Sequence, residues 1–168
     1  MSEVSARVRT HVERNPGVHL RALVRNLDIA QGQAQYHLRR LRRAGDVVSE
    51  EYGGRTHFFA PDVEPTVRRQ LAICRRETAR DVLVALAEGP AAPADVADDI
   101  GIARSTLEWH LDRLVAEDLV EKRREGGRVE LALTDSHLVG ERLAAVEPTV
   151  PDRLVDRFTR LVDGLLAD

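Results

Sequence analysis

The sequence has 168 residues and a formal net charge of −3, because 28 acidic residues outnumber 25 basic ones. Its single cysteine, Cys74, excludes an internal disulfide and suits a reducing compartment. No apolar run approaches the roughly 20 residues that a membrane-spanning helix needs, and no signal-peptide core follows the N-terminus, so we expect a soluble cytoplasmic protein with no membrane partner.

The N-terminal segment is predicted to hold three helices. Valines at i, i+4 and i+8 place one buried stripe on a helix over residues 2–14, which Asn15-Pro16-Gly17 breaks. Apolar residues at helical spacing predict two more, over residues 20–26 and about 31–44. Gly45 stands where the third helix would end.

A hairpin is predicted directly after these helices. The apolar pair Val47-Val48 and the run 58–60 flank a polar stretch with Gly53-Gly54 at its centre, which is a turn signal between two short strands. Helix, short turn, helix and ribbon together predict a winged helix-turn-helix.

The third helix presents a polar, cationic outer face, with a small residue at Gly32. Glutamine can pair with adenine, and arginine with guanine or phosphate, so this face suits a DNA major groove. The alternative is a basic helix that is merely solvated. We predict DNA contacts at Gln31, Gln33, Gln35, Tyr36, Arg39, Arg40 and Arg43.

The stretch over residues 30–55 recurs 73 residues later, without a gap, over residues 103–128. His37 recurs as His110, and Tyr36 is matched by Trp109. A period this long indicates two copies of one small domain, so the fold class is mainly α with small β-hairpin wings: two tandem winged-helix domains plus C-terminal helices.

Charge divides unevenly between the copies: residues 1–76 hold 14 Arg against 8 acidic residues, and residues 77–168 hold 11 basic against 20 acidic residues. This asymmetry indicates that the two halves have different functions, and the acidic half is a candidate for binding a protein partner.

The predicted domains are a first winged helix over 1–62, a linker helix over 63–76, the second copy over 77–134, and C-terminal helices over 135–168.

The connection between the copies lacks a strong breaker. Residues 66–86 form either one continuous helix or two helices broken near Arg76, and continuity is the slightly favoured interpretation.

The third helix of the second copy resembles a DNA-reading helix that has lost part of its binding residues. Glu108, Asp112 and Ala116 stand where the first copy has a glutamine and two arginines. A carboxylate near phosphate is unfavourable. Polar residues at the same spacing survive, so candidate DNA contacts are kept at Arg104, Ser105, Thr106 and Arg113.

Trp109 is predicted to lie on the outer face of that helix. An exposed tryptophan is uncommon, so we expect a packing role, under the linker helix, the C-terminal helices or a partner chain; DNA contact is the alternative.

Two C-terminal helices are predicted, over residues 136–146 and 150–166. Leu154, Phe158, Leu161 and Leu165 follow a 4-3-4 spacing. This stripe is either a dimer seam, which we favour, or a lid on the second copy.

Catalytic and metal motifs are missing from the sequence. None of the six histidines forms an H-x-x-x-H or Cys/His cluster, and no Walker loop, nucleophile elbow or carboxylate pair is present. We expect no enzyme activity, no metal and no cofactor, and a structural role for His37 and His110.

The segments LRALVRNLDIAQGQAQYHLRRLRRAGDVV and PADVADDIGIARSTLEWHLDRLVAEDLVEK resemble the reading unit of ArsR-like and MarR-like winged-helix regulators, especially archaeal tandem ones. The resemblance covers about residues 2–59 and 77–133. It implies a transcription regulator that binds double-stranded DNA as a homodimer joined by terminal helices, with wing arginines on the phosphate backbone or minor groove; these would be Arg55, Arg124 and Arg128.

The rival hypothesis is a protein–protein adaptor. Tandem winged helices also build ScpB-like subunits of chromosome-condensation complexes and parts of general transcription factors. The acidic second copy and the outward Trp109 favour this alternative.

Overall fold

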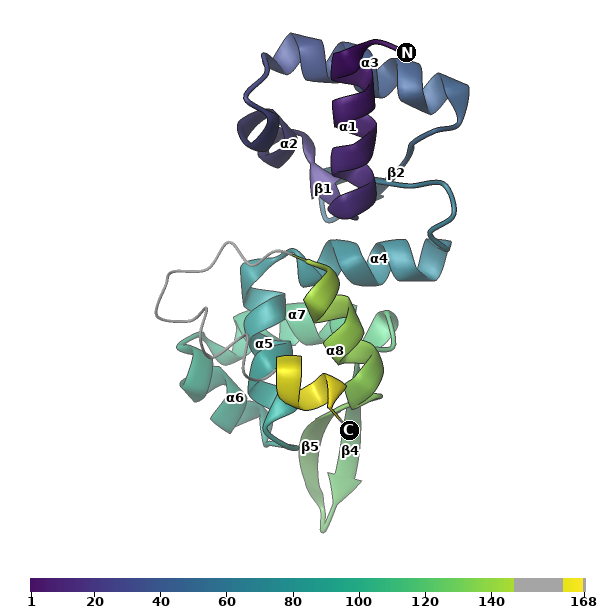
Figure 1. Ribbon diagram of the computed structural model, residues 1–168. Coiled ribbons are helices and arrows are strands. Elements are labelled where there is room, and N and C mark those ends of the chain that lie inside the picture. Colours follow the sequence, from purple (N-terminus) through teal and green to yellow (C-terminus); the bar gives the residue numbers. More distant parts are fainter. Residues whose placement is uncertain (147–161, 168) are drawn as a thin grey trace. The chain divides into compact units, whose positions relative to one another are not determined.

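The computed structural model describes residues 1–146 and 162–167. The chain divides into two compact units, a first unit over Met1–Ala72 and a second over Ile73–Asp168. Each is mainly helical with a small antiparallel sheet (Figure 1), so the predicted fold class is confirmed. No helix in the described part of the chain is long and apolar enough to cross a membrane.

The first unit begins with three helices, continues with a hairpin and includes most of helix α4 (Pro65–Cys74). Its elements before α4 are α1 (Glu3–Arg14), β1 (Val18–His19), α2 (Leu20–Leu27), α3 (Gln31–Ala44), β2 (Val48–Tyr52) and β3 (Arg55–Phe59). The Ser2 side chain caps α1 by accepting a hydrogen bond from the Ser5 amide. Gly45 ends α3 with φ of 79°, a left-handed conformation that glycine adopts without strain.

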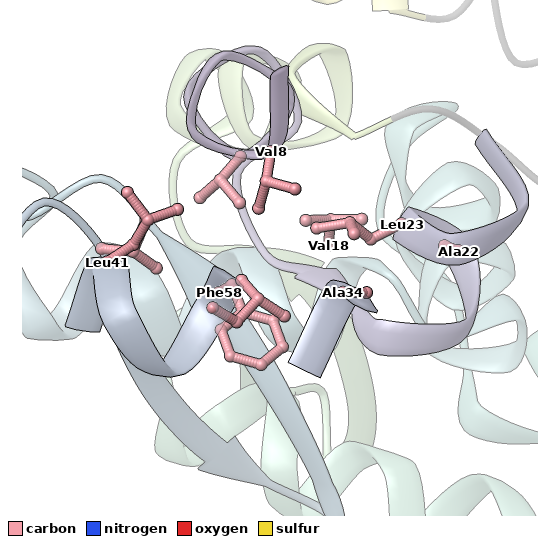
Figure 2. Packing of buried hydrophobic residues seen from close by; sticks show 10 residues of the cluster. Val8, Val18, Ala22, Leu23, Ala34, Leu41 and Phe58 are labelled. Atoms are coloured by element: carbon pink, nitrogen blue, oxygen red, sulfur yellow. The ribbon is translucent and has the colours of Figure 1, made fainter. Parts of the chain in front are cut away.

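The core of the first unit forms where α1, α2, α3 and the sheet converge. The side chains of Val8, Val18, Leu23, Leu41 and Phe58 point into one shared interior (Figure 2), and each is at most 7% exposed. Burying one such side chain contributes roughly 1.5–3 kcal/mol. This core fixes one face of α3 inward and leaves the opposite face in solvent.

The sheet of the first unit has three strands, in the order β1-β3-β2, where the sequence predicted two. Val18 pairs with Phe58, and His19 with His57. The buried His57 adds a hydrogen bond between its Nδ1 and the Gly17 carbonyl, at 2.8 Å. A two-residue strand has no periodicity of its own, so only its long-range partner reveals it.

The expectation of one continuous helix over residues 66–86 is wrong. The structure has α4 (Pro65–Cys74) and α5 (Glu77–Ala87), parted at Arg75-Arg76. Arg76 is extended, with φ of −86° and ψ of 126°. The buried Arg80 donates from Nη1 to the Cys74 carbonyl, at 3.3 Å, and so satisfies a carbonyl that the end of α4 leaves without a helical partner.

The second unit repeats the first. Its remaining elements are α6 (Pro93–Ile100), α7 (Arg104–Ala116), β4 (Val120–Glu125), β5 (Arg128–Leu133) and α8 (Ser136–Ala145). A single bridge joins Ala91 to Leu131. These two residues are Val18 and Phe58 shifted by 73, so the sequence repeat holds in the strand pairing as well.

The C-terminal prediction falls partly outside the described residues, because Leu154, Phe158 and Leu161 lie there. Leu165 belongs to a helical turn over 162–166 that packs on α8. A Cβ atom placed on Gly140 would lie 2.9 Å from the Leu165 Cβ, so this close approach requires glycine.

Candidate nucleic-acid interface

Helix α3 has one apolar face and one polar face. Ala34, His37, Leu38 and Leu41 are buried in the first unit. The seven residues of α3 that the sequence predicted as contacts are all exposed: Gln31, Gln33, Gln35, Tyr36, Arg39, Arg40 and Arg43. Arg42 is exposed as well. The outer face of α3 is therefore available to a partner.

A groove of about 880 Å³ runs between α3, the start of α2 and strand β3. We call it the α3 groove. Its lining comprises His19, Leu20, Arg21, Gln31, Gln35, Leu38, Arg39, Arg42, Arg55, Thr56 and Phe58. Four of these residues are arginines, and none is acidic. The groove thus combines amide groups and positive charge, the two kinds of donor that base edges and phosphates accept.

The groove brings together only part of the predicted set. Gln31, Gln35, Arg39 and Arg55 line it. The remaining predicted residues of α3 are exposed but do not line the groove.

Sequence reasoning missed Arg21 and Arg42. Arg42 carried a signal, because Gln31, Gln35, Arg39 and Arg42 follow one another at helical spacing and so share a stripe. Arg21 belongs to α2 and reaches the groove only through the packing of α2 on α3, which a periodicity argument does not contain.

The groove arginines have no ion-pair partner among the described residues. No carboxylate lies within 4.0 Å of the guanidinium groups of Arg39, Arg42 or Arg55 in residues 1–146 and 162–167. Elsewhere in the first unit, Arg9 pairs with Glu13 at 2.9 Å and Arg68 with Glu50 at 4.0 Å. The positive charge of the groove is therefore left open to an external anion.

Arg40 is held by its own helix. Its Nη1 donates to the Tyr36 hydroxyl at 3.1 Å, and its guanidinium carbon lies 5.7 Å from the centre of the Tyr36 ring. Tyr36 is 48% exposed, so the pair presents a polar and aromatic surface on the outer face of α3.

Helix α7 of the second unit presents a different surface. Three of its candidate DNA contacts, Arg104, Ser105 and Thr106, are exposed at its N-terminal end. Glu108 neutralises part of that end, at 3.5 Å from Arg104 and 2.9 Å from Lys122. The hydrogen bond from Lys122 lowers the pKa of Glu108, so this carboxylate stays ionised and keeps both cations occupied.

Trp109 and Arg113 form a stacked pair on α7. The Arg113 guanidinium carbon lies 3.2 Å from the centre of the Trp109 ring, and its Nη1 donates to the Trp109 carbonyl at 2.8 Å. The tryptophan is still 45% exposed. Arg113 is thus engaged within its own helix, as its counterpart Arg40 is in α3.

The second wing keeps two of its predicted contacts in solvent. Arg124 on β4 and Arg128 on β5 are exposed near the tip of the hairpin. Their neighbour Arg123 pairs with Glu121.

The described residues hold no group of three or more His, Cys, Asp or Glu side chains that could bind a metal ion. His37 is buried, and its ring lies edge-on to the Tyr36 ring with the two ring centres 5.1 Å apart. His110 takes the same position against Trp109 at 4.8 Å, and burial lowers its pKa.

Two tandem winged helix-turn-helix units, one with an open cationic groove along its third helix, define a class of nucleic-acid-binding proteins. Comparison with known proteins agrees. An N-terminal HTH domain family matches residues 2–71, and a helix-turn-helix domain family matches residues 76–123.

Relatives of the chain are regulators. An HTH-type transcriptional regulator of Methanocaldococcus jannaschii is 26% identical over 140 residues, which are 82% of this chain and 35% of that protein. The HTH-type transcriptional regulator CmtR of Mycobacterium tuberculosis is 37% identical over 81 residues, which are 43% of this chain and 69% of CmtR. The NMR structure of the cadmium metal-sensor CMTR from M. tuberculosis matches at 35% identity and a TM-score of 0.42, over 49% of this chain and 93% of that one.

The chain belongs to the helix-turn-helix transcriptional regulators and is ArsR-like. The predicted family is therefore confirmed, and it is a family of regulators and not of enzymes. The chain spans only about a third of the length of the M. jannaschii relative.

Proposed function

We propose that the first unit binds double-stranded DNA in a sequence-specific manner, with α3 in the major groove and the β2–β3 hairpin against the neighbouring backbone. The observation that carries this proposal is the α3 groove, which is lined by four arginines and no carboxylate. An uncompensated cationic surface of this kind attracts the phosphate backbone and releases counterions on binding.

Within the groove, different side chains take different roles. Gln31 and Gln35 carry amide groups that can donate to and accept from an adenine edge. Arg39, one turn after Gln35, reaches a guanine edge or a phosphate. Arg55, at the start of β3, contacts the backbone beside the groove.

Gly32 supports a close approach of α3 to the duplex. A Cβ atom at this position would have nothing within 4 Å, so packing inside the unit does not require the glycine. Glycine in a helix costs about 0.5–1 kcal/mol relative to alanine. An external partner that comes close to the backbone explains why this cost is accepted.

The second unit has a different role in this proposal. Its α7 helix does not read bases, because Glu108 and Asp112 oppose phosphate and stand where α3 has Gln35 and Arg39. Arg124 and Arg128 on its wing contact the backbone. The regulator acts as a homodimer through the C-terminal helices, and its two α3 helices address half-sites about 34 Å apart or a multiple of that distance.

The experiment is a fluorescence-anisotropy titration of the full chain with labelled duplexes at several salt concentrations. The wild-type protein is expected to bind random duplex at low salt and one site more tightly. Gln35→Ala should change the preferred sequence, and Arg55→Gln should weaken binding to every sequence alike. Wild-type protein that binds no duplex at 50 mM salt would show the proposal to be wrong.

One observation favours a second function, a protein-binding role for the second unit. Trp109 is 45% exposed on a face that carries no net charge, since Arg104 and Arg113 balance Glu108 and Asp112. Trp109→Ala should then weaken association with a partner chain or a second copy and leave duplex affinity unchanged. Analytical ultracentrifugation beside the anisotropy titration distinguishes the two roles.

We do not propose cadmium sensing, which is the property named for CMTR, for this chain. Metal-bound thiols must be deprotonated. Cys74, the single cysteine, is fully buried, and burial raises the pKa of its thiol to about 12. The residues present do not fit a thiolate metal site.

A further inference from the structure

A second hollow lies beside the α3 groove. It has a volume of about 460 Å³, and we call it the side pocket. Its lining comprises Arg39, Arg42, Arg43, Val47, Val48 and Ser49. Arg39 and Arg42 line both the side pocket and the α3 groove, so the two hollows adjoin along these two side chains.

The pocket concentrates positive charge without compensation. Arg39, Arg42 and Arg43 are spaced i, i+3 and i+4, which places their side chains on neighbouring positions of one helix face. Like charges at this spacing disfavour the helix. No carboxylate forms an ion pair with any of the three within residues 1–146 and 162–167, although the same unit does supply carboxylates to Arg9 and Arg68.

We propose that the side pocket binds one backbone phosphate of the duplex that occupies the α3 groove. This inference rests on the proposed function. Guanidinium groups donate in a planar fork that matches the oxygens of a phosphate. A DNA strand passing along the groove carries its phosphates past Arg39 and Arg42, and these two residues lead directly into the pocket.

The duplication supplies an internal comparison. The residues of the second unit that correspond to the three pocket arginines are Asp112, Val115 and Ala116. This position therefore carries one negative charge in the second unit and three positive charges in the first. The positive charge at this position is therefore specific to the first unit and is not required by the shared fold.

Arg43→Gln tests the inference, because Arg43 lines the side pocket and not the α3 groove. Loss of one phosphate contact reduces the slope of log K against log salt by about 0.9 and weakens binding about eightfold at 0.1 M salt. The preferred sequence should not change. Arg43→Lys should retain the slope, because the slope reports the charge that neutralises the phosphate and not the geometry of the donor.

Arg9→Gln is the matched control. It removes the same charge from the first unit at a residue whose guanidinium already has two carboxylate partners, Glu13 at 2.9 Å and Asp46 at 3.9 Å, and is therefore not open to a phosphate. The expected result is a wild-type slope. If Arg9→Gln lowers the slope as much as Arg43→Gln does, the effect is one of net charge and the pocket assignment is wrong.

Ethylation interference locates the phosphate itself. Modification of one phosphate should weaken the wild-type complex, and that sensitivity should vanish in Arg43→Gln. A duplex that binds tightly with an unchanged slope and an unchanged interference pattern in Arg43→Gln overturns this inference while the proposed function stands. Wild-type protein that binds no duplex overturns both.

Discussion

Helices α3 and α7 are the same element in two copies of one domain; they share buried leucines and differ in charge on the solvent face. Leu38 and Leu41 of α3 are buried as Leu111 and Leu114 are in α7. On the outside, Arg39 and Arg43 correspond to Asp112 and Ala116.

As a result, α3 carries four arginines and no carboxylate, whereas α7 carries two arginines and two carboxylates. Packing requirements alone would leave both outer faces free to vary. Among the described residues, the arginines of α3 form no ion pair, whereas Glu108 of α7 pairs with Arg104 and Lys122. Each prediction below tests one side of this contrast.

The largest expected effect concerns the buried core leucines, which the two copies share. Leu41→Ala and Leu114→Ala remove side chains that are 2% and 0% exposed. Each should lower the free energy of unfolding of its own unit by about 2–5 kcal/mol, since a cavity remains where the side chain packed. Urea unfolding followed by circular dichroism measures this. A change below 1 kcal/mol for one of the pair would show that the two cores are not equivalent.

The next effect concerns the outer face of α3, which contacts DNA in the proposed function. A triple variant, Gln35→Glu with Arg39→Asp and Arg43→Ala, gives α3 the residues of α7 at these positions. Loss of two phosphate contacts alone weakens duplex binding about 60-fold at 0.1 M salt, and the new carboxylates add repulsion. Ser105→Ala with Thr106→Ala on α7 is the control, with affinity expected within about twofold of wild type. Equal losses from both variants would remove the distinction between the units.

Gly32→Ala separates stability from binding. Because nothing lies within 4 Å of the added Cβ, the variant should be stabilised by up to about 1 kcal/mol. Its duplex affinity should nevertheless fall, because the methyl group holds α3 away from the base edges. Thermal unfolding and anisotropy on the same sample measure the two quantities. A variant that is both more stable and binds as wild type would remove the evidence for close approach at Gly32.

The smallest effect concerns the ends of the two helices. Gly45 follows α3 with φ of 79°, whereas its counterpart Asp118 has φ of 56°. A left-handed conformation costs aspartate more than glycine. Asp118→Gly should raise the free energy of unfolding by about 0.5–1 kcal/mol, and Gly45→Asp should lower it by a similar amount. Unchanged stability in both variants would show that the left-handed conformation does not cost aspartate more than glycine at these positions.

The fold was largely predictable from the sequence because its elements have local patterns. Periodic apolar residues define α1, α2 and α3, and the 73-residue repeat transfers the same assignment to the second unit. The errors arose where structure depends on distant partners. Strand β1 exists through its pairing with β3, and the break between α4 and α5 occurs where the buried Arg80 binds the Cys74 carbonyl.

The candidate site was predictable to a similar extent. Periodicity located the outer face of α3, so all seven predicted residues on it are exposed. It did not show that α2 contributes Arg21 to the same groove, because that depends on how two helices pack. Nor could it show that the guanidinium of Arg113 lies 3.2 Å from the centre of the Trp109 ring while that of its counterpart Arg40 lies 5.7 Å from the Tyr36 ring, since rotamers are set by the local surface.

The most direct test of the division between the units is an amide ¹H–¹⁵N NMR titration of the full chain with its preferred duplex. We expect shift changes and line broadening along the exposed face of α3, centred on Gln35 and Arg39, and at Arg55 on the first wing. The amides of Trp109 and Asp112 on α7 should stay unperturbed. Perturbations that cluster on α7 while α3 remains silent would contradict the central claim that the first unit is the reader.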